Sequence, residues 1–155
     1  YLASPDFGGL SVTIPHKLRV QPFLDELTDS ARKIGAVNTI TPRPALVTSR
    51  TTLGGACVLT GDNTDWIGIC ECISKALRKR SGAPTGRALV VGSGGTARAA
   101  CYAMTAGRRA RGEAPFSLLV YARDISKAEE LAKTAWAFAT AGQSNAPLFT
   151  ALAYC

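Results

Sequence analysis

The sequence predicts an α/β fold in two parts, of which the second is the first half of a doubly wound parallel sheet. Three features lead to this expectation. From residue 88 onwards the apolar pattern alternates strand, helix, strand, helix; a glycine-rich turn joins the first strand to its helix; and the small, proline-containing segment 81–86 separates this pattern from the residues before it. We therefore expect one domain over residues 1–82 and a second over residues 83–155.

The first part should consist of short strands and helices. In chain order we expect a strand over 9–14, a helical or turn segment over 18–27, a helix over 29–34, a strand over 36–40, a loop over 42–55 and a helix from 64 to about 80. Pro15 should stop the first strand, because its nitrogen has no proton to donate to the ladder. Thr28 is a candidate N-cap for the 29–34 helix, and Gly35 is the candidate for its end.

The second part should begin with a strand over 88–91, where four apolar residues run together. A glycine loop, a helix opening at about 98, a strand over 116–121 and a helix over 126–139 should follow. The tail from 142 cannot be assigned to an element from its pattern. Between the first helix and the second strand, residues 106–115 carry three arginines and form a longer connection than a usual turn.

Charge and composition restrict the classes of partner. The net charge of +7 gathers partly in the clusters at 78–80 and 108–111, which we expect to be solvated loop faces. Aromatic residues do not alternate with these clusters, so we expect no nucleic-acid partner. No apolar run approaches the ~18 residues of a spanning helix, so we expect no membrane span.

The cysteines point to a reducing compartment. There are five of them, an odd number, and none are in a CxxC spacing. This pattern argues against a disulfide framework and against a zinc or other metal site. We expect reduced thiols that serve as small apolar residues in a cytoplasmic protein.

The glycine loop follows the 88–91 strand and opens the next helix. It consists of Gly92, Ser93, Gly94, Gly95, Thr96 and Ala97. A first glycine allows a tight turn, a second lets the backbone approach a pyrophosphate, and the helix N-terminus adds free N–H groups. Glycines also occur in purely structural turns, so the glycines alone are weak evidence. The position of this loop between a buried strand and a helix is what predicts a dinucleotide site.

The end of the second strand should select the dinucleotide. An acidic residue there binds a free ribose 2′-hydroxyl, whereas an arginine accommodates a 2′-phosphate. Arg123 and Lys127 at this corner favour NADP, while Asp124 would repel a phosphate if it pointed inward. We expect NADP, with NAD as the alternative.

Three polar clusters, at 11–17, 35–39 and 61–65, follow strands or begin loops. Taken singly, Lys17 reads as a solvated lysine and the 62–65 cluster as a helix cap. If they converge, the clusters would offer a cation, a carboxylate and neutral hydrogen-bonding groups to a hydroxylated small molecule. His16 is the only histidine, and we expect it to be structural, because neighbouring side chains at a strand end diverge.

The strings SVTIPHK, IGAVNTI, GDNTDWIGI and GSGGTARAA, in this order, resemble the shikimate/quinate dehydrogenase family over residues 7–131. The resemblance implies a substrate-binding α/β domain followed by a Rossmann domain, and NADP-dependent reduction of 3-dehydroshikimate to shikimate. It also implies roles for individual residues. Lys17 and Asp65 would form the catalytic pair, Thr13 and Asn38 would bind the substrate, residues 92–97 would bind the cofactor phosphates, and Arg123 with Lys127 would hold the 2′-phosphate.

Some features depart from the family pattern. The first residue is Tyr1, and the family's serine motif for the substrate carboxylate is absent, so we expect a fragment of a longer, multidomain chain. The usual Asn-Arg-Thr corner reads Ala122-Arg123-Asp124 here. Two alternatives to a shikimate dehydrogenase therefore stay open: a non-catalytic regulator on the same fold, such as the quinate-pathway repressor, and an NAD-dependent quinate dehydrogenase.

Overall fold

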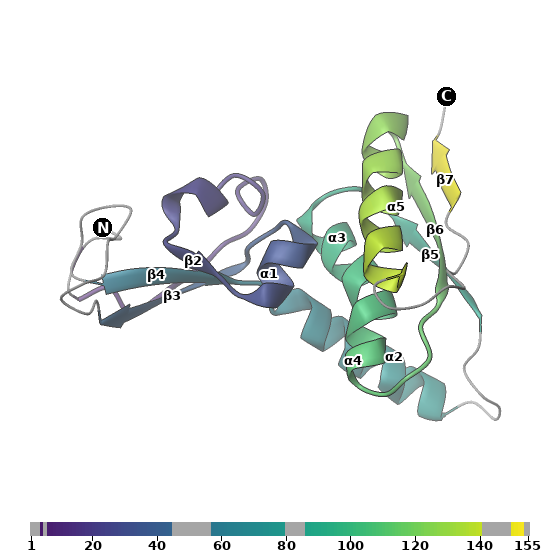
Figure 1. The fold of residues 1–155 in the computed structure, drawn as a ribbon, viewed down its shortest axis with the longest axis horizontal. Helices are drawn as coiled ribbons and strands as arrows, with labels where there is room; N and C mark the ends of the chain where they lie inside the picture. The colour runs from purple at the N-terminus through teal and green to yellow at the C-terminus, as the bar shows by residue number, and fades with distance from the viewer. Residues whose placement is uncertain (1–3, 5, 45–56, 80–85, 141–149, 154–155) are drawn as a thin grey trace. The chain divides into compact units, whose positions relative to one another are not determined.

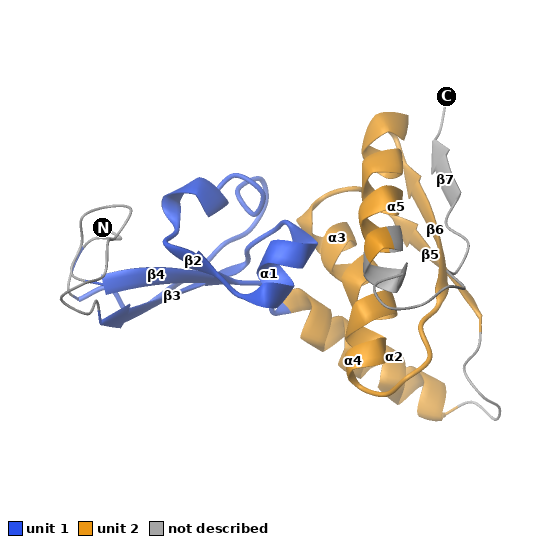
Figure 2. Cartoon of the chain, in the orientation of Figure 1, with its two compact units in different colours: residues 1–64 blue, residues 65–155 orange. Residues whose placement is uncertain are grey.

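A computed structural model describes residues 4, 6–44, 57–79, 86–140 and 150–153 of the chain. The chain forms two compact units, residues 1–64 and residues 65–155, which Figure 2 distinguishes by colour. The predicted boundary after residue 82 lies outside the described residues. The division after Thr64 assigns the helix that follows it to the second unit.

The first unit contains a four-stranded mixed sheet in the order β1-β3-β4-β2. Its elements are β1 (Leu10–Ser11), η1 (Gln21–Phe23), β2 (Glu26–Leu27), α1 (Asp29–Ile34), β3 (Thr39–Pro44) and β4 (Cys57–Asp62). β3 pairs antiparallel with β1 and β4, whereas β2 runs parallel to β4. A small core on this sheet consists of Phe7, Val12, Leu24, Ala31, Val37, Ile40 and Leu59.

Helix α1 has the bounds that its caps predict. The Thr28 hydroxyl accepts a hydrogen bond from Ala31 N at 3.2 Å, which satisfies one of the free amides of the first turn. Gly35 ends the helix in the left-handed conformation, with φ of 70°, which glycine adopts without steric cost. The prediction of this helix is confirmed.

The strands around α1 differ from the prediction. β1 covers only two residues of the expected 9–14 strand, and the expected 36–40 strand begins at Thr39 and continues through Pro42 to Pro44. Proline is tolerated there because β1 pairs only with Thr39 and Ile40, so the rest of β3 has no described strand on its other side. β4 fills residues that the sequence pattern left unassigned.

The second unit contains a parallel sheet in the order β5-β6-β7. Its elements are α2 (Asp65–Arg78), β5 (Arg87–Val91), α3 (Gly95–Tyr102), the π-helical turn η2 (Ala103–Gly107), α4 (Arg108–Ala110), β6 (Ser117–Ala122), α5 (Ile125–Thr140) and β7 (Thr150–Ala153). Figure 1 shows α5 alongside β6 and β7. The predicted alternation of strand and helix is confirmed, and the unassigned tail supplies β7.

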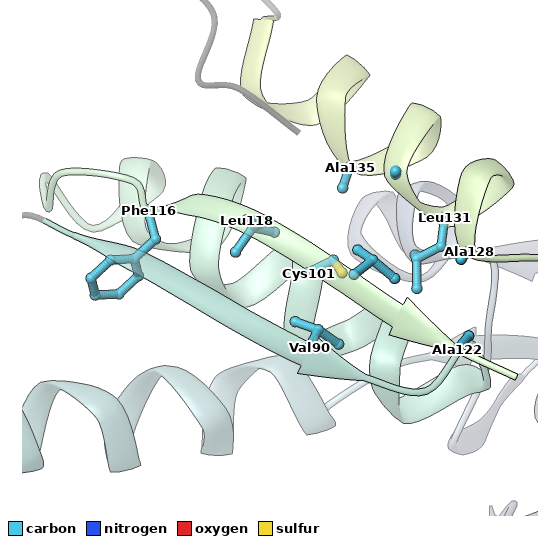
Figure 3. Close-up of a cluster of buried hydrophobic side chains, with 10 residues drawn as sticks. Val90, Cys101, Phe116, Leu118, Ala122, Ala128, Leu131 and Ala135 are labelled. Atoms are coloured by element: carbon cyan, nitrogen blue, oxygen red, sulfur yellow. The ribbon is translucent and has the colours of Figure 1, made fainter. Parts of the chain in front are cut away.

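One face of this sheet packs against α3 and α5. The buried cluster between them contains Val90, Cys101, Phe116, Leu118, Val120, Ala122, Ala128, Leu131, Ala132 and Ala135 (Figure 3). The alternation of buried residues along β6 follows the two-residue period of a strand. This core holds the ends of β5 and β6 in register, with Val91 opposite Tyr121.

The arginine-rich connection 106–115 is not a solvated loop, so that expectation is wrong for its first arginine. The Arg108 side chain is only 2% exposed and lies 2.7 Å from the Glu113 carboxylate. Its Nε donates to Ala114 O at 2.7 Å, and its guanidinium lies 4.4 Å from the centroid of the Phe116 ring. The buried charge is stable because it is paired and hydrogen-bonded.

Helix α2 packs against this connection. A Cβ on Gly107 would lie 3.0 Å from Trp66 Cε3 and 3.3 Å from Cys70 Sγ, so glycine permits the close approach. The Ser74 hydroxyl donates to Glu113 at 3.0 Å, and Arg111 donates to a Glu71 carboxylate oxygen at 2.6 Å. Apolar and polar contacts therefore join α2 to the second unit.

Within the described residues, no helix has the length and apolar character to cross a membrane. The cysteines of the described ranges, Cys57, Cys70, Cys72 and Cys101, are free thiols.

Candidate functional site

The structure brings together segments that carry three of the predicted residues in the first unit. Val12 N donates to Asn38 O at 2.7 Å, which joins the end of β1 to the start of β3. Val37 N donates to Lys17 O at 2.8 Å, so the lysine's turn is fixed to the same place. Asn38 N donates to Asp62 O at 2.9 Å and adds the turn that follows β4. Main-chain bonds thus join the three polar clusters.

Asn38 is the centre of this arrangement and is 9% exposed. Its side-chain Oδ1 accepts from Thr64 N at 2.9 Å, and its Nδ2 donates to Thr64 Oγ1 at 3.1 Å. Its Oδ1 also accepts from Thr39 Oγ1 at 2.8 Å. The side chain therefore holds the residue immediately before Asp65.

The 62–64 turn is fixed by a second set of bonds. Asp62 Oδ1 accepts from Thr28 Oγ1 at 2.6 Å, from Ser30 Oγ at 3.1 Å and from Asn63 N at 2.7 Å. Asn63 is fully buried, and its Nδ2 donates to Ala36 O at 3.0 Å. Asp62 thus joins this turn to the N-cap of α1, and the interpretation of the cluster as a cap of α2 stays a prediction.

The proposed catalytic pair is divided between the units. Lys17 is half-buried in the turn after β1, in the first unit. Asp65 is the first residue of α2 and belongs to the second unit. The pairing of the two side chains stays a prediction.

Thr13 lies beside a small cavity in the first unit. The cavity has a volume of about 340 Å³, and its lining consists of Leu10, Ser11, Val12, Thr13, His16, Arg19, Val20 and Phe23. Thr13 and His16 are both exposed, and His16 N donates to Thr13 O at 2.8 Å. The substrate-binding role of Thr13 remains a prediction.

In the second unit, the glycine turn begins where β5 ends. Gly92 has φ of 117°, a conformation that side chains disfavour, and its N donates to Tyr121 O at 2.7 Å. Gly94 is extended, and nothing lies within 4 Å of the position of a Cβ there, so the space above it is open. Gly95, Thr96 and Ala97 form the first turn of α3, whose amides point out of the helix end.

A cavity of about 460 Å³ lies over this turn. Its lining consists of Val91, Gly92, Ser93, Gly94, Tyr121, Ala122, Arg123, Asp124 and Lys127. The first three loop residues and both predicted cations are therefore in one cavity, whereas Gly95, Thr96 and Ala97 are outside its lining. Positive side chains, an open glycine and a helix N-terminus suit a phosphate-bearing ligand.

Four lining residues were not among the predicted binding residues: Val91, Tyr121, Ala122 and Asp124. Tyr121 is half-buried on β6, and only the strand register places it beside Val91. Asp124 precedes α5, and its Oδ1 accepts from Lys127 N at 3.2 Å. Its Oδ2 lies 3.6 Å from Lys127 Nζ. The acidic group at the corner could be recognised from the sequence, but its position in the cavity could not.

In the described ranges, no group of three or more His, Cys, Asp or Glu side chains could hold a metal ion.

Comparison with protein families and curated proteins identifies relatives. The Shikimate dehydrogenase substrate binding domain family matches residues 1–40. The Pentafunctional AROM polypeptide of Mycosarcoma maydis is 45% identical over 134 residues, which cover 86% of this chain and 7% of that polypeptide. The chain thus spans a small part of the relatives it matches.

Solved structures give the same result. The dehydroquinate dehydratase and shikimate dehydrogenase of S. pombe AroM is 40% identical, with a TM-score of 0.56, over 86% of this chain and 22% of that one. A shikimate dehydrogenase in complex with NADP+ has a TM-score of 0.67 at 27% identity, and the match covers 94% of this chain and 42% of that enzyme's chain. A quinate dehydrogenase from Corynebacterium glutamicum in complex with NAD has a TM-score of 0.65 at 26% identity, over 96% and 44% of the two chains.

Proposed function

Since this chain belongs to the shikimate dehydrogenase family, we propose that it contributes to the NADP-dependent reduction of 3-dehydroshikimate to shikimate. The reaction is part of the biosynthesis of aromatic compounds. The chain would act within a larger multidomain polypeptide, as the pentafunctional AROM relatives suggest, and we propose that it does so in the cytoplasm. The substrate is a small hydroxylated carboxylic acid.

One observation carries the proposal. Direct hydrogen bonds join the turn of Lys17, the segment just before β3 that contains Asn38, and the turn before Asp65, although these segments are far apart in the sequence. A purely solvated lysine and a purely structural cap would not require this convergence. It supports a site with one cation, one carboxylate and neutral polar groups.

Each residue has a distinct proposed role. When bound, NADPH supplies the hydride that the carbonyl carbon accepts. Lys17 polarises the carbonyl oxygen and gives it a proton, which leaves a neutral amine, while Asp65 orients the ammonium group before this transfer. Thr13 and Asn38 would bind the substrate hydroxyls and so hold the carbonyl beside Lys17.

The cavity in the second unit would hold the cofactor. Its glycine turn leaves room for a pyrophosphate beside the α3 amides. Arg123 and Lys127 would offer positive charge to a 2′-phosphate. Asp124 favours a second candidate, an NAD-dependent quinate dehydrogenase, because a carboxylate accepts a hydrogen bond from a free 2′-hydroxyl.

The test is Lys17→Ala in the complete protein, in an assay that monitors the oxidation of shikimate through the formation of NADPH. We expect kcat to fall by about two to four orders of magnitude while the Kd for NADP is unchanged. The matched control is Lys33→Ala, because Lys33 is an exposed lysine of α1 that lies outside the lining of the Thr13 cavity and should leave kcat within about threefold.

Either of two results would contradict the proposal. Unchanged turnover in Lys17→Ala would remove the lysine from the mechanism. A wild-type protein that binds shikimate without oxidising it would identify the non-catalytic regulator.

A further inference from the structure

The arginine-rich connection contains a carboxylate that serves two partners. The first partner of Glu113 is Arg108, whose buried guanidinium lies 2.7 Å away, and Glu113 N also donates to Arg108 O at 2.9 Å. A buried charge without its partner is costly, so Arg108 keeps the Glu113 carboxylate at one place in the second unit. Neither residue lines the nucleotide cavity.

The second partner of Glu113 is helix α2. Ser74 is 6% exposed, and its hydroxyl donates to the two oxygens of the Glu113 carboxylate at 3.0 Å and 3.3 Å. Nearly one turn earlier on the same helix, Glu71 accepts from Arg111 at 2.6 Å. Hydrogen bonds to charged groups are strong and directional, so these two contacts set the position of α2 along its own axis.

The contacts nearer the start of α2 are less directional. The Trp66 and Tyr102 rings meet edge to face, with their centroids 5.3 Å apart, and Cys70 Sγ is a weak donor to Ala103 O at 3.4 Å. Hydrophobic burial has no preferred direction. These contacts therefore hold α2 against the unit but define its axial position less sharply than the bonds at Ser74 and Glu71.

A displacement of α2 also moves Asp65. Asp65 is the first residue of this helix and lies about 14 Å from Ser74 along the axis, at roughly 1.5 Å per residue. A helix moves as a rigid element over that length, so a shift at Ser74 reaches Asp65. Asp65 and the nucleotide cavity belong to the same unit, and the shift would change the distance from the carboxylate to a bound cofactor.

We propose that Glu113 is a positioning residue for Asp65. It holds α2 through Ser74, so that the Asp65 carboxylate stays at the distance from the cofactor that the reaction requires. Misplacing a reacting group by about 1 Å can cost on the order of 10²-fold in rate, so even a partial displacement is measurable. This inference rests on the proposed function, because it takes Asp65 as the catalytic carboxylate.

Two double variants isolate the bond from Ser74 to Glu113. Arg108→Met/Glu113→Ala removes the buried charge together with its partner, so that no charge is left unpaired, and it removes the acceptor as well. Arg108→Met/Glu113→Gln removes the same two charges but keeps an oxygen that accepts from Ser74. The two proteins therefore differ in the acceptor alone.

Two single variants complete the set. Ser74→Ala breaks the same bond from the side of α2 and leaves the ion pair between Arg108 and Glu113 in place. Leu131→Val trims a buried side chain of α5 and is the control for a general loss of stability.

The complete protein is assayed for kcat and KM with shikimate and NADP, and the binding of adenosine 2′,5′-bisphosphate is measured by calorimetry. We expect kcat to fall about tenfold in Arg108→Met/Glu113→Ala and in Ser74→Ala, and to stay within about threefold of the wild type in Arg108→Met/Glu113→Gln. The KM for shikimate and the Kd for the bisphosphate should change by less than about twofold, because these residues line neither cavity. Leu131→Val should lower Tm and leave kcat unchanged.

Three outcomes would overturn the inference while the proposed function stands. Equal kcat values in the two double variants would show that Glu113 stabilises the fold without positioning Asp65. A Kd for the bisphosphate that rises in step with the loss of kcat would show that the whole unit is disturbed. An equal loss of kcat in Leu131→Val would show that reduced stability alone accounts for the effect. A wild-type protein that does not oxidise shikimate would instead refute the proposed function, and this inference with it.

Discussion

The candidate sites of the two units are held in place by different kinds of interaction. In the first unit, polar side chains and main-chain groups hold one another, with Asn38 and Asp62 each making several hydrogen bonds. In the second, an apolar core holds two strand ends, and the cavity at their end is formed by glycine backbone and exposed charges. The first site depends on a connected network, in which loss of one member leaves its partners unsatisfied. The second site tolerates changes of charge, so single substitutions there should change its affinity for a ligand only by small factors.

The largest effect that separates the units is expected at Asp65. Asp65→Asn removes the charge that would hold the Lys17 ammonium, so kcat should fall by about 10²- to 10³-fold in the complete protein. Binding of adenosine 2′,5′-bisphosphate should be unchanged, because Asp65 does not line the nucleotide cavity. Asp29→Asn, which neutralises an exposed carboxylate, should alter neither quantity. An unaltered kcat in Asp65→Asn would exclude the carboxylate from the catalytic pair.

The network of the first unit is tested by Asp62→Ala. The change leaves Thr28, Ser30 and Asn63 N without their acceptor, so the free energy of unfolding should drop by about 2 kcal/mol. Urea unfolding followed by circular dichroism measures this loss. Asp29→Ala breaks only the exposed pair with Lys33 and should cost about 0.5 kcal/mol or less. Equal losses in the two variants would contradict the idea of a network.

How far the sequence alone predicts this molecule depends on how local each determinant is. Helix α1 was predictable because Thr28 and Gly35 act on neighbouring amides and carbonyls. The alternation in the second unit was predictable because its apolar runs are continuous. By contrast, β4 contains Gly61, and a Cβ there would lie 2.5 Å from Leu24 Cδ1, a constraint from a residue far away in the chain. The burial of Arg108 likewise depends on Glu113 and Phe116 after the turn.

The candidate site follows the same rule. The loop glycines and the two cations could be named from their spacing, and the structure gathers Gly92, Gly94, Arg123 and Lys127 around one cavity. The bonds from Asn38 to Thr64, 26 residues away, could not be read from the sequence, because a polar side chain has many potential partners. Motifs therefore identify the reactive groups, and tertiary contacts determine which of them are already engaged.

Packing in the second unit is tested with two glycines that differ in their surroundings. Gly107→Ala would place a methyl group 3.0 Å from Trp66 and should destabilise the chain by about 1–2 kcal/mol. Gly68 lies inside α2 with nothing within 4 Å, so Gly68→Ala should stabilise by about 0.5–1 kcal/mol through a better helix propensity. Thermal unfolding of both variants gives the signs, and equal signs would contradict the described packing of α2.

The smallest expected effect concerns the thiols, which report on the core without altering the chain. Burial raises the pKa of the Cys101 thiol to about 12, so at pH 8 only roughly one molecule in ten thousand carries the reactive thiolate there. Burial likewise raises the pKa of Cys70, whereas Cys72 is exposed on the same helix α2. At pH 8 a thiol reagent should label Cys72 quickly and Cys101 only after unfolding in urea, with the labelled positions identified by mass spectrometry. Raising the pH to 9 should leave Cys101 protected, because that pH is still well below its pKa. Rapid labelling of Cys101 in the folded chain would show that the core between β6, α3 and α5 opens readily, and the contrast between a rigid core and an adjustable cavity would then fail.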